Sequence, residues 1–135
     1  MKKYFVIGNP IKHSLSPQIH NYWMNKYNLT NSVYEKKEAE AKDLKKIIEN
    51  IKDDKITGAN VTVPFKKSII PYVDELHEAA KDTQSVNTLH KVGNKIVGYN
   101  TDTLAFLRTI RDHYGFAIPK IDVNVPRRDF FILGA

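Results

Sequence analysis

The sequence predicts an α/β domain with a mostly parallel sheet, helices on both faces of the sheet and one antiparallel hairpin. Short apolar runs alternate along the chain with segments whose apolar residues recur at helical spacing. Two of the apolar runs are separated only by Gly93-Asn94, which is a strong signal of a two-residue hairpin. The chain has 135 residues, 41% of them apolar and 27% charged, which is enough for one domain with a hydrophobic core.

The first half of the chain predicts three strands and two helices. Residues 4–8 are an apolar run closed by a Gly-Asn-Pro turn, and residues 32–37 and 55–63 are the next two strands. Ser16 opens the first helix, because its hydroxyl can cap free backbone N–H groups and the following proline suits the first helical position. Residues 41–51 carry apolar side chains on one face and charges on the other, which predicts the second helix.

The second half of the chain predicts two more helices around the hairpin. A helical stretch covers residues 66–81 and is interrupted near Pro71. The hairpin strands are residues 86–92 and 95–100. A capped helix then runs over residues 101–114.

Composition excludes several classes of protein and of site. The chain has no cysteine, which excludes disulfide scaffolds, zinc fingers, iron–sulfur clusters and thiol nucleophiles. The histidines are not spaced as metal ligands, so we expect no metal site. No apolar run approaches about 18 residues, and the start lacks the long apolar region of a signal peptide. We therefore expect a cytoplasmic protein without a membrane segment.

The chain is basic, with a formal net charge of +6. Lysines stand beside acids, as in residues 36–38 and 52–55, and this alternation is typical of a solvated surface. We therefore expect no nucleic-acid partner. The sign of the charge fits an anionic small ligand.

Polar residues gather where an open α/β sheet binds its ligands, beyond the carboxyl ends of the strands. Three polar loops follow strands in this way, at residues 8–16, 60–66 and 99–102. Counting back from a two-residue turn pairs Asn87 with Asn100 in the hairpin, which brings Asn87 beside the last of these loops.

The loops supply two kinds of side chain. Lys66 and Asp102 are charged and could form a proton-transfer pair. Structural roles stay open for both, as surface charge for the lysine and as a helix N-terminal carboxylate for the aspartate. The neutral donors and acceptors match a ligand with several hydroxyl groups; they are Ser14, Ser16, Asn60, Thr62 and Asn87.

Four blocks of the sequence stand in the order and spacing of a known family. The blocks are Ser14-Leu15-Ser16-Pro17, Gly58-Ala59-Asn60-Val61-Thr62-Val63-Pro64-Phe65-Lys66, Val86-Asn87-Thr88 and Gly98-Tyr99-Asn100-Thr101-Asp102. In these blocks the chain resembles the amino-terminal, substrate-binding domain of shikimate dehydrogenases, and the match covers almost the whole chain. The Asn-Val-Thr-x-Pro-x-Lys block is highly specific.

The resemblance implies one domain of a two-domain α/β enzyme. It implies the reversible, NADPH-dependent reduction of 3-dehydroshikimate to shikimate in aromatic amino-acid biosynthesis, with NADP bound by a carboxy-terminal domain that the chain lacks. By the same resemblance, Ser14 and Ser16 would bind the substrate carboxylate. Lys66 would handle the proton at the carbonyl being reduced, with Asp102 orienting it or sharing the proton. The ring hydroxyls would be contacted by Asn60, Thr62, Asn87 and Asp102.

The resemblance also divides the chain. Residues 1–114 would be the substrate-binding domain, residues 115–128 a linker, and residues 129–135 the first strand of a truncated dinucleotide-binding domain, where Gly134 begins the Gly-rich turn. We therefore expect a fragment that is inactive alone. Its tail after about Gly115 is expected to be disordered or packed against another molecule.

Some alternatives remain open. The chain departs from the family pattern at Gln84-Ser85, where Gly-Ala is usual, and at Thr103 and Ala105, where smaller residues are favoured; these changes bear on substrate affinity. A quinate/shikimate dehydrogenase that uses NAD is one alternative, although quinate-accepting members often carry threonine where Ser16 stands. A non-catalytic module that binds a hydroxylated cyclic acid is another, although it would not need a lysine–aspartate pair. The preference for NADP or NAD and the formation of a homodimer also stay open.

Overall fold

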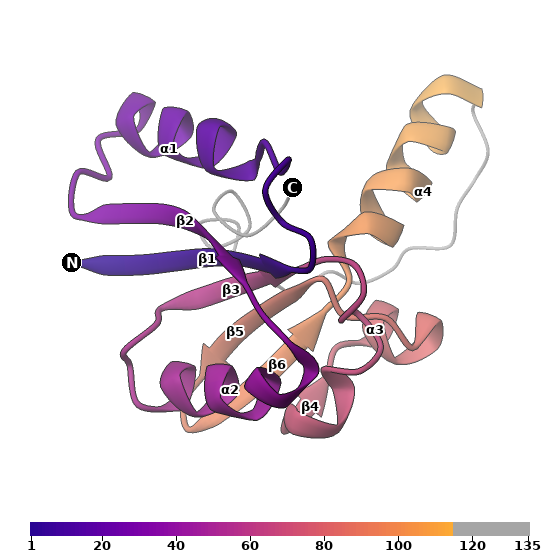
Figure 1. Ribbon diagram of the computed structural model, residues 1–135. Helices are drawn as coiled ribbons and strands as arrows, with labels where there is room; N and C mark the ends of the chain where they lie inside the picture. Colours follow the sequence, from indigo (N-terminus) through magenta and orange to yellow (C-terminus); the bar gives the residue numbers. More distant parts are fainter. Residues whose placement is uncertain (115–135) are drawn as a thin grey trace.

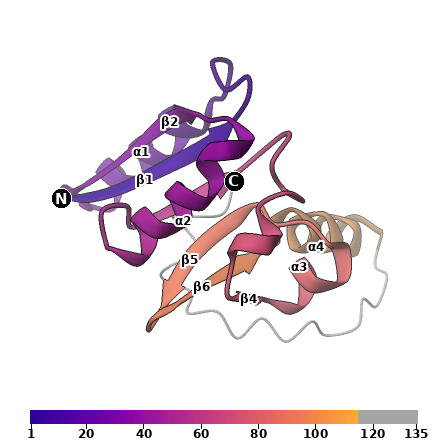
Figure 2. The same ribbon diagram turned by 60° about the horizontal axis from the view of Figure 1, so that its bottom comes forward.

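The computed structural model describes residues 1–114 as one mixed sheet with helices on both of its faces (Figures 1 and 2). The predicted linker and the last predicted strand lie outside the described residues. The strands are β1 (Lys2–Gly8), β2 (Ser32–Glu38), β3 (Gly58–Val61), β4 (Glu75–Leu76), β5 (Thr88–Val92) and β6 (Lys95–Tyr99). The helices are α1 (Ser16–Lys26), α2 (Leu44–Lys52), α3 (Glu78–Thr83) and α4 (Thr101–Tyr114), with short 3₁₀ turns at Ala41–Asp43 and Ile70–Tyr72.

The six strands of the described part are arranged in the order β2-β1-β3-β5-β6-β4. β1 runs parallel to both β2 and β3, and β4 runs parallel to β6. β5 is antiparallel to both of its neighbours, β3 and β6. The fold class predicted from the sequence is therefore confirmed. The hairpin is also confirmed in its register, since Val92 pairs with Lys95 across the predicted turn.

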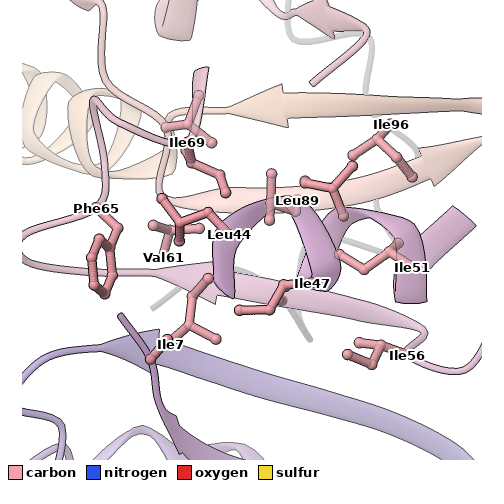
Figure 3. Close-up of a cluster of buried hydrophobic side chains, with 14 of the residues drawn as sticks. Ile7, Leu44, Ile47, Ile51, Ile56, Val61, Phe65, Ile69, Leu89 and Ile96 are labelled. Carbon is pink, nitrogen blue, oxygen red and sulfur yellow. The ribbon is translucent and has the colours of Figure 1, made fainter. Parts of the chain in front are cut away.

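The two faces of the sheet carry separate apolar cores because neighbouring residues of a strand point to opposite faces. On the α1 face, Tyr4 and Val6 of β1 are buried with Met24 and Tyr34. On the other face, α2 packs its apolar side onto the strands, as its periodicity predicts. The residues labelled in Figure 3 include Leu44, Ile47 and Ile51 of the helix and Ile7, Val61, Leu89 and Ile96 of the strands.

The predicted helix over residues 66–81 is wrong up to residue 77 and is confirmed only at its end, in α3. The chain there forms turns, the 3₁₀ turn Ile70–Tyr72 and the short strand β4, and only α3 (Glu78–Thr83) is helical. Proline at position 71 cannot donate a backbone hydrogen bond inside a helix, and its ring clashes with the preceding turn. Phe65 and Ile69 are buried, so their packing on the sheet holds this segment in turns. The predicted strand over residues 55–63 is shorter than expected and covers Gly58–Val61.

Asp74 links this segment to the sheet. Its carboxylate accepts hydrogen bonds from the Ile96 N–H group at 2.7 Å and from the Lys52 ammonium at 2.9 Å. The bond from Ile96, followed by that from Lys52, lowers the pKa of Asp74 below its ordinary value of 3.8. The depressed pKa means that the stabilisation is present above the ordinary pKa and is lost as the pH falls through the folded-state pKa.

Replacing Asp74 should therefore remove an acid-sensitive contribution to stability. We expect Asp74→Asn to lower the melting temperature at pH 7. We expect the gap in melting temperature between this variant and the parent chain to narrow as the pH falls below 3.8. Thermal unfolding followed by circular dichroism at several pH values measures the gap. Asp82→Asn is the control, because Asp82 is exposed and its side chain makes no hydrogen bond or ion pair within residues 1–114. A gap that is independent of pH would contradict the prediction.

Candidate functional site

Ser14 lies in the loop that leads from β1 into α1, Ser16 is the first residue of α1, and both are partly buried. The prediction that Ser16 caps α1 is wrong, because the helix begins without a side-chain cap. Instead the Ser14 hydroxyl oxygen accepts a hydrogen bond from the Ser16 N–H group at 3.3 Å. Within residues 1–114 the Ser16 hydroxyl takes part in no hydrogen bond, so it is not committed to the helix end.

Thr62 and Lys66 belong to the tight turn that follows β3. The Thr62 N–H group donates to the carbonyl of Ile7 at 2.9 Å, which continues the β1–β3 pairing beyond the strand. Phe65 is buried and anchors the turn. The Lys66 carbonyl accepts a hydrogen bond from the Val86 N–H group at 2.8 Å, so the turn is also tied to the segment before β5.

Gly8 allows the ends of β1 and β3 to approach closely at this turn. A Cβ atom at position 8 would lie 2.6 Å from Cγ2 of Thr62 and 3.0 Å from the carbonyl oxygen of Val63. We expect Gly8→Ala to lower the free energy of unfolding by about 1–3 kcal/mol, as overpacking does, measured by chemical denaturation. Thr62→Ser removes the nearer clashing atom, so the double variant should recover part of the loss. Simple additivity of the two changes would contradict this explanation.

Lys66 and Asp102 form an ion pair between the β3 turn and the first turn of α4. Lys66 Nζ lies 2.6 Å from Asp102 Oδ2, and the two side chains are 33% and 45% exposed. An ion pair with this exposure contributes little to stability, typically less than about 1 kcal/mol. The pair therefore leaves the lysine ammonium both oriented and reachable by a ligand.

Asn87 lies beside the start of α4, as the predicted hairpin register requires. Its amide oxygen accepts hydrogen bonds from the Thr101 N–H group and the Thr88 hydroxyl, each at 3.0 Å. Its amide nitrogen donates to the Thr101 hydroxyl at 2.8 Å. Asn100 has a structural role here, because its side-chain oxygen accepts from the Thr103 N–H group at 3.0 Å and so caps α4.

Asn60 is buried under the site, and its amide is held on both sides. Its nitrogen donates to the carbonyl of Asn87 at 3.2 Å and to the hydroxyl of Thr88 at 3.1 Å. Its oxygen accepts a hydrogen bond from the Tyr34 hydroxyl at 2.6 Å. Sequence reasoning missed Tyr34, because a tyrosine in a predicted strand is more simply explained as a core residue.

The structure brings the predicted residues to one edge of the sheet. Ile7 pairs with Val61 in parallel register, so the loops that follow β1 and β3 begin side by side (Figure 1). The Val61 N–H group donates to the Asn87 carbonyl at 2.8 Å, which joins β3 to the segment before β5. The ion pair of Lys66 then connects the β3 turn to α4. The arrangement offers hydroxyl, amide, ammonium and carboxylate groups to a polar ligand.

Residues 1–114 contain no group of three or more histidine, aspartate or glutamate side chains that could hold a metal ion. No helix in the same range is long and apolar enough to cross a membrane.

The comparison with protein families decides which family this fold and site represent. A family model described as the shikimate dehydrogenase substrate binding domain matches residues 6–89. This chain belongs to that family. Among its relatives, a shikimate dehydrogenase (NADP(+)) of Pelagibacter ubique is 50% identical over 136 residues, which is all of this chain and 48% of the relative. One from Aquifex aeolicus is 41% identical over 132 residues, covering 98% of this chain and 46% of the relative.

Solved structures of the shikimate dehydrogenase family have the same fold. The crystal structure from Aquifex aeolicus aligns with a TM-score of 0.76 at 42% identity, covering 85% of this chain and 43% of that chain. A Listeria monocytogenes shikimate 5-dehydrogenase in complex with shikimate and NAD aligns with a TM-score of 0.78 at 32% identity, covering 87% of this chain and 40% of that one. The chain thus spans about half the length of the relatives that it matches.

Proposed function

We propose that this chain is the substrate-binding domain of a shikimate dehydrogenase that interconverts 3-dehydroshikimate and shikimate with NADP(H). The observation that carries the proposal is the Lys66–Asp102 pair, 2.6 Å between Nζ and Oδ2, at the edge of the sheet where the family's sequence blocks meet. The named activity of the relatives, which are NADP(+)-dependent shikimate dehydrogenases, supports it.

Each segment of the site offers side-chain groups that suit one part of the substrate. The hydroxyl groups of Ser14 and Ser16 would donate hydrogen bonds to the carboxylate. Asn87 uses its oxygen and one N–H group within the protein, so its second N–H group would donate to a ring hydroxyl. Thr62 would contact a ring hydroxyl as well. Asn60, whose amide is held by Asn87, Thr88 and Tyr34, would contact a ring hydroxyl as well.

The proton in this reaction would be handled by the ion pair. In the direction of reduction, the Lys66 ammonium would donate a proton to the carbonyl oxygen of 3-dehydroshikimate. In the reverse direction, the amine would take the proton from the hydroxyl. Asp102 would hold Nζ in place through the contact of 2.6 Å and would contact a ring hydroxyl with its other oxygen.

NADPH would supply the hydride. Residues 1–114 do not have the features of a binding site for this cofactor. The glycines in this range lie in strands or in the hairpin turn, and they do not form the Gly-rich turn that holds the pyrophosphate of a dinucleotide. The side chains of this range would therefore bind the substrate and move its proton, without holding the cofactor. We propose that residues 129–135 begin the dinucleotide-binding domain and that residues 115–128 form the linker.

The 135-residue chain alone offers a direct test. Ligand-observed NMR and calorimetry should show weak shikimate binding, because a site without its opposite wall leaves water to compete for each hydrogen bond. The same measurements should show no binding of NADPH at millimolar concentration and no turnover. Cyclohexanol, which lacks the carboxylate and has a single hydroxyl, is the comparison ligand. NADPH binding at micromolar affinity, or no difference between shikimate and cyclohexanol, would overturn the proposal.

A further inference from the structure

Two buried aromatic side chains lie behind the site and have no role in the function proposed above. His20 of α1 and Tyr34 of β2 are each 1% exposed. Their rings are stacked, with centroids 4.1 Å apart and planes 9° from parallel. Trp23 contacts the histidine ring edge-on at 5.5 Å between centroids. The pair thus forms a rigid packing unit between the helix and the sheet.

The histidine of the pair contacts the first residue of its own helix, Ser16. His20 Nδ1 lies 2.8 Å from the carbonyl oxygen of Ser16. A carbonyl only accepts hydrogen bonds, so Nδ1 carries the proton in this contact. Burial lowers the pKa of His20, which favours the neutral ring. The other nitrogen, Nε2, is buried and has no hydrogen-bond partner within residues 1–114.

The unpaired Nε2 atom indicates that His20 has a role beyond filling space in the core. An unpaired buried polar atom is destabilising, and an apolar side chain of similar size would fill the space without that penalty. The property that an apolar side chain would lack is the hydrogen bond to the Ser16 carbonyl.

The tyrosine side of the pair holds the end of β3. Its hydroxyl donates to Asn60 Oδ1 at 2.6 Å, and burial raises the pKa of Tyr34, which keeps the hydroxyl protonated. The backbone of Tyr34 is fixed by the side chain of Asn21, which accepts from its N–H group at 3.0 Å and donates to its carbonyl at 2.8 Å. The ring of Tyr34 therefore has little freedom to move.

We propose that His20 and Tyr34 are positioning residues that set the separation between the serine segment (residues 14–16, which lead into the first turn of α1) and the end of β3 (residues 60–62). The serine segment would bind the carboxylate end of the substrate, and the end of β3 would bind the ring. The stacked rings would therefore keep these two segments at the distance that shikimate requires. This role rests on the proposed function for its ligand. The contacts that connect residues 14–16 with residues 60–62 through His20 and Tyr34 are present in the chain without a ligand.

Three variants and one control test the link in the 135-residue chain. Tyr34→Phe keeps the stacked ring and removes the hydroxyl. His20→Gln removes the donor at the Nδ1 position, whereas His20→Asn places an amide nitrogen there and should restore the bond to Ser16. Ile51→Val is the control, because Ile51 lies in the core on the other face of the sheet. All measurements are made well below the melting temperature of each variant.

Two readouts are required from these variants. In two-dimensional NMR of the free chain, Tyr34→Phe should shift the amide resonances of residues 14–16, to which the lost hydroxyl is not hydrogen-bonded. His20→Gln should shift those of residues 60–62. Both variants should weaken shikimate binding about fivefold, the effect of losing one hydrogen bond. His20→Asn restores the bond to Ser16 but not the stacked ring, so it should recover part of the lost affinity. The control should lose stability without losing affinity.

The outcomes separate the two proposals. If Tyr34→Phe leaves residues 14–16 unshifted, the spacer role is wrong, whatever the ligand. If the resonances shift but the affinity for shikimate is unchanged, the pair is structural and the proposal is overturned. If the parent chain does not bind shikimate at all, the proposed function fails, and the resonance shifts alone decide whether the link exists. If His20→Gln does not fold, the milder Tyr34→Phe decides.

Discussion

Lys66→Ala should lower kcat by about 10²–10⁴-fold, which is the range for a general acid–base group, with a smaller change in KM. The assay uses the chain joined to the part of the Pelagibacter relative that lies beyond the match, since that relative is 50% identical over the whole of this chain. The physical reason is the position of Nζ, which lies 2.6 Å from Oδ2 of Asp102 on a side chain that is partly exposed. Without it, no side chain at this position can donate the proton to the carbonyl oxygen.

Lys67→Ala is the matched control for this experiment. Lys67 is the next residue in the same turn and is exposed, and it forms no ion pair within residues 1–114. It should leave kcat close to the parent value. Steady-state rates with shikimate and NADP would be measured over a range of pH, because loss of an acid–base group also changes the pH profile. A Lys66→Ala enzyme with near-normal kcat would show that the pair is structural.

Ser14→Ala should raise KM for shikimate about tenfold or more. A hydrogen bond to a charged group contributes roughly 1.5–3 kcal/mol, which corresponds to about a tenfold or larger change in affinity. In the structure the Ser14 hydroxyl oxygen accepts from the Ser16 N–H group at 3.3 Å, which leaves its proton for the carboxylate. The measurement is KM in the joined enzyme and the dissociation constant in the chain alone.

Two comparisons make the serine prediction specific. Ser32→Ala is the matched control, because Ser32 begins β2 at the opposite end of the strands and should leave KM unchanged. A shikimate analogue without the carboxylate should lose little affinity on Ser14→Ala. If the analogue and shikimate lose affinity equally, Ser14 does not recognise the carboxylate.

Local sequence was sufficient wherever neighbouring residues determine the structure. Gly93-Asn94 sets the hairpin and its register, since Gly93 adopts φ +60° there and the pairing of Val92 with Lys95 follows. From that register alone, Asn87 could be placed beside α4, and its hydrogen bonds to Thr101 agree. The periodicity of residues 41–51 likewise predicted the buried face of α2.

Local sequence misled where packing from another part of the chain prevails. Residues 66–74 have apolar spacing that resembles a helix, but the buried side chains of Phe65 and Ile69 and the ring of Pro71 hold them in turns. Ser16 has the residue type of a helix cap, yet the Ser14 hydroxyl reaches its N–H group instead. Both outcomes depend on side chains whose positions a propensity does not encode.

The sequence by itself determined the fold class, the hairpin and the four blocks that carry the polar residues, because turn chemistry, periodicity and short motifs are properties of adjacent residues. The tertiary structure decided which of the candidate contacts between those residues form. The pairing of Lys66 with Asp102 joins segments 36 residues apart, and the bond from Tyr34 to Asn60 joins segments 26 residues apart. Such contacts are set by the order of strands in the sheet and by packing across its faces, and no local pattern contains that information.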